Sequence, residues 1–174
     1  MLFVYFILFS SLFSSTNNRC FHEEMTQNRG RPSLDTYYES PSGHFWIHYD
    51  LSGENAPSST DSNSNNIPDY VERAGVIADS TRQILTEIMN FRQEIPDIDG
   101  KYDIYILDLG SSLSGAYGWN CIDSNDDIVG SSWVEIDNDY SEDIYAVKGL
   151  IAMEFTVAHE FFHAIQRAYK ENSF

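Results

Sequence analysis

Basic side chains are scarce in this chain of 174 residues, in which ten lysines and arginines stand against 27 aspartates and glutamates, for a formal net charge of −17. This imbalance repels phosphate backbones and anionic lipid, so we expect no nucleic-acid partner. Cysteine is scarce too, since only Cys20 and Cys121 are present. They could pair in an oxidising compartment, or they could be two unrelated thiols, and the sequence leaves both readings open.

The N-terminal residues are the longest apolar run, but this run is too short to span a bilayer comfortably. Residues 1–13 are almost entirely apolar, and serines follow, which is typical of a secretory signal peptide over residues 1–16, although no basic residue precedes the run. Polar residues just before Cys20 argue against a lipid anchor, so no stable membrane anchor is expected. We expect a secreted protein with a linker or propeptide over residues 17–40 and one domain over residues 41–174.

Alternating and helical patterns predict a mixed α/β or α+β domain with a small sheet packed on a long helix. Residues 68–90 repeat apolar side chains at steps of three and four, which predicts an amphipathic helix beginning near Pro68. A second helical pattern runs from about 143 to about 170. Strands are expected at 43–49, 102–109 and 131–137, with a Gly/Ser loop over 110–118.

The second helical pattern contains His159-Glu160-Phe161-Phe162-His163. Four residues span just over one helical turn, so both imidazoles leave the same face and can bind one zinc ion. Glu160 is placed to take a proton from metal-bound water and to pass it to the leaving amine. The surrounding residues are apolar, which predicts a buried helix in which two histidines and a glutamate need a partner. The competing interpretation is a buried helix whose histidines only hydrogen-bond to backbone groups.

Residues 156–165 resemble the extended active-site pattern of the zincin metallopeptidases. The stretches 43–49, 61–72 and 156–166 together resemble a family of secreted prokaryotic metalloproteases with a "HEFFHAIQ" helix, over roughly residues 41–170. The resemblance implies a gluzincin-like N-terminal catalytic subdomain in which a glutamate on a following helix is the third zinc ligand. We expect that ligand beyond residue 174, because Glu171 is about 12 Å along the axis from His163. The chain is therefore expected to be truncated at its C-terminus.

An acidic, asparagine-rich segment precedes the first helix and places oxygen donors in nearly the order of a calcium-binding loop. The expected ligands at its positions 1, 3, 5, 7, 9 and 12 are Asp61, Asn63, Asn65, the Ile67 carbonyl, Asp69 and Glu72. Asn66 stands where such loops usually carry glycine, and asparagine tolerates the left-handed backbone needed there. The alternative is a solvated linker with Asp69 near a helix start.

Three functions remain open at this point. The first is a secreted zinc endopeptidase acting on peptide or protein substrates, with Zn²⁺ and possibly Ca²⁺ as cofactors. The second is a non-catalytic, calcium-stabilised extracellular binding or adhesion module on a zincin scaffold, and the third is an inactive remnant. Retention of Glu160 favours the first, because a structural zinc site does not need that base. The strand at 131–137 could be the edge strand above the zinc or an ordinary core strand, and the oligomeric state is unknown.

Overall fold

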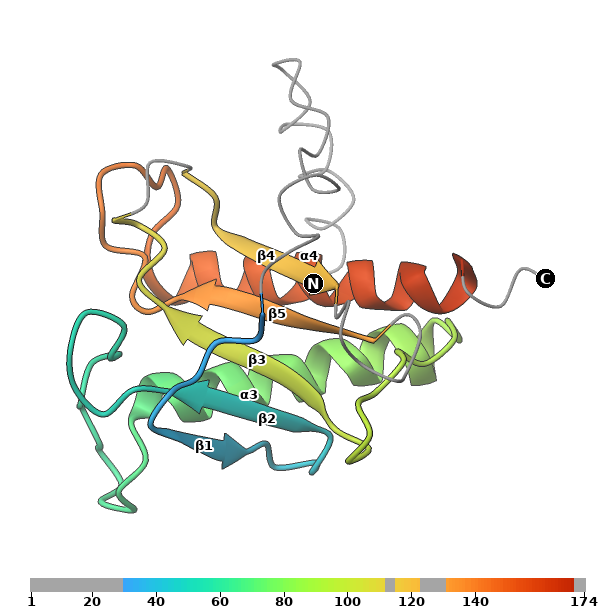
Figure 1. Ribbon diagram of the computed structural model, residues 1–174, viewed down its shortest axis with the longest axis horizontal. Coiled ribbons are helices and arrows are strands. Elements are labelled where there is room, and N and C mark those ends of the chain that lie inside the picture. Colours follow the sequence, from blue (N-terminus) through green and yellow to red (C-terminus); the bar gives the residue numbers. More distant parts are fainter. Residues whose placement is uncertain (1–29, 112–114, 123–130, 171–174) are drawn as a thin grey trace.

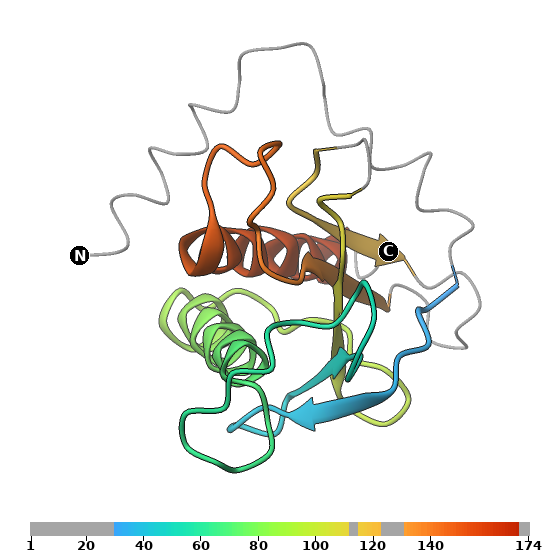
Figure 2. The same cartoon turned by 90° about the vertical axis from the view of Figure 1, so that its left-hand side faces the viewer.

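The computed structural model describes residues 30–111, 115–122 and 131–170, and these form one sheet covered on one face by two helices (Figure 1; Figure 2). The elements in chain order are β1 (Thr36–Glu39), β2 (Phe45–Tyr49), α3 (Asp69–Arg82), the π-helix η1 (Gln83–Ile88), β3 (Tyr102–Leu107), β4 (Gly118–Ile122), β5 (Ser132–Asp137) and α4 (Gly149–Lys170). This arrangement confirms the expected mixed α and β class.

The sheet has the strand order β1-β2-β3-β5-β4. The three central strands β2, β3 and β5 run parallel, whereas β1 and β4 pair antiparallel to their neighbours. The crossover from β2 to β3 carries α3, the usual connection between parallel neighbours. Strand β4 is last in this order and contacts α4. A site on this part of α4 would therefore be bordered by β4.

The core lies between the inner face of the sheet and the two helices. Strand β2 alternates, with Phe45, Ile47 and Tyr49 buried against the helices and Trp46 and His48 on the opposite face. Helix α3 contributes small and branched side chains at helical spacing, and α4 contributes an almost wholly apolar face. Phe161 of α4 packs edge to face on both Phe45 and Tyr102. Aromatic packing therefore fixes the rotation of α4 on the sheet.

Several predicted boundaries need correction. The helix expected from about 143 begins at Gly149, whose φ of +62° ends the preceding turn. Strand β4 occupies Gly118–Ile122, part of which was expected to be loop, and β1 lies within the interval expected to be linker or propeptide. The strand at 131–137 is internal, because β5 pairs with both β3 and β4. It is a core strand, and the edge-strand interpretation of it is wrong.

The helix expected at 68–90 is present as two parts, since the α-helical hydrogen bonding of α3 changes to π-helical bonding over η1. No helix in the described part of the chain is both long enough and apolar enough to cross a membrane. The expected signal peptide at 1–16 and Cys20 lie outside the described residues, and Cys121 is buried in β4.

Candidate metal centre on helix α4

The side chains of His159 and His163 converge on α4. Their Nε2 atoms are 3.2 Å apart, and the two rings stand nearly perpendicular at 88°. Two nitrogens bound to one tetrahedral zinc at about 2.05 Å would be separated by about 3.3 Å. The same separation is a hydrogen-bonding distance between a donor and an acceptor nitrogen, so it permits either a metal ion or a proton between the rings.

Gln166 orients the second histidine, a contact that the spacing of the two histidines did not indicate. Its Oε1 lies 2.9 Å from His163 Nδ1. An amide oxygen can only accept, so Nδ1 carries the hydrogen and Nε2 presents its lone pair. A hydrogen bond to the outer ring nitrogen is the usual way in which a metal-binding histidine is held in one tautomer. With Nδ1 bonded to Gln166, the free lone pair of His163 Nε2 is suited to bind a metal ion.

Glu160 lies on the adjacent side of α4 and is only 7% exposed, whereas His159 is exposed and His163 is half-buried. Its side chain packs on the first residue of β4, where a Cβ atom added to Gly118 would lie 3.2 Å from Glu160 Cγ and 2.4 Å from Thr156 Cγ2. The absence of a side chain at Gly118 thus lets β4 lie directly on this part of α4. The buried Glu160 is therefore next to His159 in the sequence of α4 and packs against the start of β4.

Farther along α4, a buried polar network ties the same strand to the helix. Arg167 Nε donates to Asn120 Oδ1 at 2.8 Å, and the Asn120 amide donates to Tyr102 Oη at 2.8 Å. Tyr102 Oη is also 2.8 Å from Ser132 Oγ. Strand β4 is therefore attached to α4 at two points, by close packing at Gly118 and by hydrogen bonding at Asn120.

A cluster of tyrosines supports the N-terminal half of α4. Tyr140 is fully buried and packs on Tyr117 and Tyr145. Burial raises the pKa of Tyr140, and the charges of Asp137 and Glu160 add to the rise. Tyr140 therefore stays neutral, and its hydroxyl donates to the Tyr117 carbonyl at 2.9 Å.

Asp137, at the end of β5, organises the loop that carries these tyrosines and is fully buried. Its carboxylate accepts five hydrogen bonds, with lengths between 2.5 and 3.0 Å, from the backbone N–H groups of Leu109, Gly110, Asp139 and Tyr140 and from the Tyr145 hydroxyl. No pattern in the sequence indicated this role for Asp137 or its loop. In the sequence, a single aspartate at the end of a strand cannot be distinguished from an ordinary turn residue.

Asp137, Asp139 and Glu142 also form an acidic group whose nearest oxygens lie within 4.8 Å of one another, close enough to hold a metal ion. Burial and the surrounding negative charges raise the pKa of Glu142. The oxygens of Asp137 are already saturated by donors, however, and a cation would have to displace them. The group therefore fits a loop-organising role better than a metal site.

The acidic loop before α3 has several features of a calcium loop. Asp61 accepts the N–H groups of Asn65 and Asn66, and Asn66 has a φ of +68° at the position usually held by glycine. The Asn63 and Asn65 amides both reach the Glu72 carboxylate, at 3.0 and 2.7 Å. Positions 3, 5 and 12 of the expected loop thus lie together, with the asparagine nitrogens facing Glu72 and the asparagine oxygens accepting backbone N–H groups.

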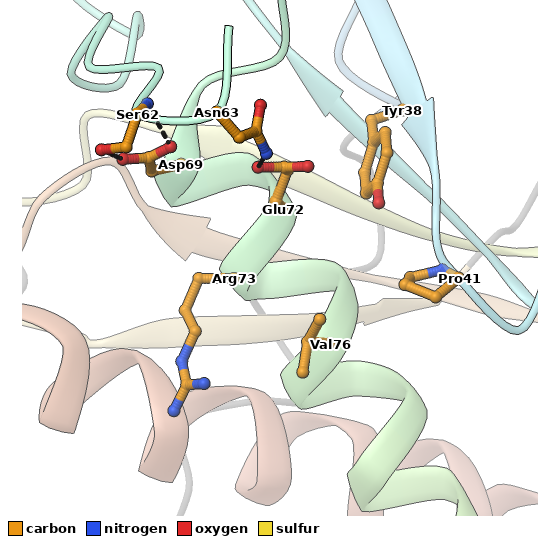
Figure 3. A pocket seen from close by; sticks show the side chains of 8 residues that line it. All are labelled: Tyr38, Pro41, Ser62, Asn63, Asp69, Glu72, Arg73 and Val76. Carbon is orange, nitrogen blue, oxygen red and sulfur yellow. Dashed lines mark hydrogen bonds between the residues drawn. The ribbon is translucent and has the colours of Figure 1, made fainter. Parts of the chain in front are cut away.

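Asp69 points elsewhere in this arrangement. Its carboxylate accepts the Ser62 N–H at 2.9 Å and the Ser62 hydroxyl at 2.6 Å, and these bonds lower its pKa. At the seventh position, the Ile67 N–H donates to Asn65 Oδ1. The loop also forms one wall of an open surface hollow of about 530 Å³ (Figure 3). The residues lining it are Tyr38, Pro41, Ser62, Asn63, Asp69, Glu72, Arg73 and Val76.

Comparisons with known proteins neither support nor oppose the family resemblance of the sequence. No protein-family model matches the chain, and neither a curated protein nor a solved structure matches it. The function of the chain is therefore inferred from its residues and from the geometry of the site on α4.

Proposed function

We propose that this chain is a secreted zinc-dependent peptidase, in which His159 and His163 bind the metal and Glu160 is the general base. The observation that carries the proposal is the 3.2 Å separation of the two Nε2 atoms, close to what one tetrahedral ion requires. The buried carboxylate of Glu160 on the same helix supports it. A structural zinc site has no need of such a base.

Each residue has a separate part in this proposal. When bound, zinc would supply Lewis acidity that polarises the scissile carbonyl and lowers the pKa of water. His159 and His163 hold the ion, and Gln166 keeps the His163 ring in the binding tautomer. Glu160 accepts the proton of the attacking water and later delivers it to the leaving amine nitrogen.

A third protein ligand is proposed to come from outside the described residues. Within the ranges that the structure describes, Asp137, Asp139 and Glu142 are the only group of three or more candidate metal-binding side chains, and the histidine pair does not belong to it. Two imidazoles alone leave half of a tetrahedral shell to other groups. This agrees with the glutamate that the zincin resemblance places farther along the chain.

The geometry also favours a place for the substrate. A peptide that pairs with a sheet must do so at an edge, and β5 is unsuitable because both of its sides are paired. Strand β4 is last in the sheet order and begins beside Glu160. We therefore assign the proposed substrate-pairing role to β4 in place of the strand at 131–137.

The proposal predicts that Glu160→Gln abolishes hydrolysis without loss of the metal. Removing a general base typically lowers the rate by about 10²- to 10⁴-fold, whereas the imidazoles that bind zinc are unchanged. The measurement is cleavage of a quenched peptide library by the zinc-loaded protein, with zinc content determined in parallel. Undiminished cleavage by the variant refutes the role of Glu160, and no cleavage by a zinc-loaded wild type that includes the third zinc ligand refutes the peptidase proposal.

The alternative is a non-catalytic binding or adhesion module that is stabilised by calcium. The order of oxygen-bearing residues in the loop and the proximity of Asn63 and Asn65 to Glu72 support a calcium ion here, which would need the asparagine oxygens turned toward it. Calcium is compatible with both functions, because an ion there would pin the loop to the start of α3 and stabilise the scaffold. Retained calcium binding without hydrolysis would favour the alternative.

Calcium should raise the thermal midpoint of the protein. A ligand that binds only the folded state stabilises it by about 2.7 kcal/mol at 100 times its dissociation constant. We expect Asp61→Ala and Glu72→Gln to remove most of this effect, measured by thermal unfolding with calcium and with chelator. Asp143→Ala, which changes an exposed acid paired with Lys148, is the control and should leave it intact. An equal response in all three variants contradicts the assigned loop.

A further inference from the structure

The segment of residues 31–35, here called the N-terminal strap, crosses the face of the sheet opposite α3 and α4 (Figure 1; Figure 2). Its Leu34 packs against a cluster built on Tyr105 and Trp133, and the Arg31 guanidinium lies 5.2 Å from the centre of the Trp133 ring. No helix of the described residues covers this outer face. The strap therefore covers part of this outer face, and the contacts that hold the strap keep the face covered.

Arg31 holds the strap by charge. Its two Nη atoms each lie 2.6 Å from an oxygen of Asp97, which makes a bidentate pair, and Nη1 also contacts Asp103. His48 Nε2 lies 2.9 Å from the other Asp103 oxygen. The side chains of Arg31, Asp97 and Asp103 are between 11% and 22% exposed, so solvent screens these charges less than on an open surface.

The two carboxyl groups do not titrate alike. Burial and a hydrogen bond with Asp103 raise the pKa of Asp97 to about 7, although Arg31 opposes the rise. Burial would also raise the pKa of Asp103, but contacts with His48 and Arg31 lower it below its usual value. Tyr37 and Tyr105 are further ionisable groups that pack on His48, and burial raises the pKa of Tyr105 to about 12. The apparent pKa values of such a close pair of acids belong to the pair, with the higher value assigned to Asp97.

We propose that Arg31, Asp97 and Asp103 form a lock in which a proton and the strap compete for the Asp97 carboxylate, so that acid loosens the strap from the sheet. The competition follows from reciprocity, because a cation that disfavours protonation of Asp97 is itself disfavoured by that proton. Strap attachment strengthens as pH rises above about 7, the pKa of Asp97 with the strap docked, toward the higher pKa of Asp97 without Arg31. The equilibrium constant for strap attachment changes by about tenfold for each pKa unit by which docked Arg31 lowers the pKa of Asp97.

Global stability should move in the other direction. The pKa of Asp97 is raised above its unfolded value of about 3.9, so its contribution to stability is full below that value and is lost as pH rises through about 7. Local attachment of the strap and global stability therefore respond oppositely to the same proton. A general acid-induced loosening of the protein would weaken both together.

The test is hydrogen exchange of residues 31–36 in the full chain, corrected for intrinsic rates, at about pH 5 and about pH 8. The wild type should show stronger protection of this segment at the higher pH. Asp97→Asn, which resembles the protonated acid, should show weak protection with no such dependence, and Arg31→Gln should match it. Thermal unfolding should show that Asp97→Asn gains stability over wild type as pH rises through about 7.

Two further variants separate the lock from its surroundings. Asp99→Asn changes an acid in the same loop that bonds Trp46 and not Arg31, and it should keep the wild-type pH dependence. His48→Gln removes the histidine next to Asp103 and should keep it as well if Asp97 is the titrating group. An unchanged pH dependence in Asp97→Asn, or its loss in His48→Gln alone, overturns the proposal.

Discussion

Asp137→Ala should cause a severe loss of stability. The change leaves four backbone N–H groups without their acceptor in a partly buried loop, while the Tyr145 hydroxyl keeps only its longer bond to the Ala116 carbonyl. Each orphaned donor costs about 1–3 kcal/mol, although the losses are not additive. A total of at least about 4 kcal/mol is expected, which is a large share of the stability of a typical domain. Urea unfolding followed by circular dichroism measures it.

Two variants in the same position and loop control this result. Asp137→Asn keeps the shape but replaces one accepting oxygen with a donor, so it should lose less than alanine and still more than about 1 kcal/mol. Asp139 is exposed and accepts the Ser141 N–H at 2.7 Å, so Asp139→Ala should cost no more than about 1 kcal/mol. Equal losses for Asp137→Ala and Asp139→Ala would show that the loop is not organised by the buried carboxylate.

Gly118→Ala should give the next largest loss. Its Cβ would lie 2.4 Å from Thr156 Cγ2 and 2.8 Å from the Glu135 carbonyl oxygen, and the latter belongs to backbone that cannot rotate away. Overpacking of this kind typically costs about 1–3 kcal/mol. The strain falls on the side of α4 that carries Glu160, so β4 should separate from the helix at the proposed base.

Gly30→Ala is the matched control, because nothing lies within 4 Å of the Cβ it would add. It should change the free energy of unfolding by no more than about 0.5 kcal/mol. Comparable unfolding midpoints for the two alanine variants would contradict the close contact between β4 and α4. In that contradicting case, hydrogen exchange of the β4 amides in Gly118→Ala would also stay at the wild-type rate.

Local periodicity is sufficient to predict the main elements of the fold. Apolar residues at steps of three and four identify the helix that is observed as α3 and η1, and the spacing of His159 and His163 places both rings on one face of α4. Both inferences depend only on helical geometry within a few residues. The strand at 131–137 is also identified from its local sequence, but its partners in the sheet are not.

Features that depend on distant residues cannot be found in this way. Strand β4 has the sequence Gly-Trp-Asn-Cys-Ile, in which glycine and asparagine weaken the local β signal, and it exists because it pairs with β5. The contacts of Asp137 and of Arg31 join positions up to 72 residues apart. In the sequence, Gly149 resembles an interruption of a longer helix, although its left-handed backbone marks the start of α4.

Zinc binding by the histidine pair is the most direct test of the proposed metal centre. The measurement is a zinc titration by equilibrium dialysis on wild-type protein and on His163→Ala, with calcium present to saturate other oxygen sites. We expect one zinc ion per chain for the wild type, and for the variant a loss of affinity larger than the roughly 10- to 100-fold that removal of an outer-shell partner causes. A wild type that binds no zinc, or a variant that binds it equally well, would contradict the account.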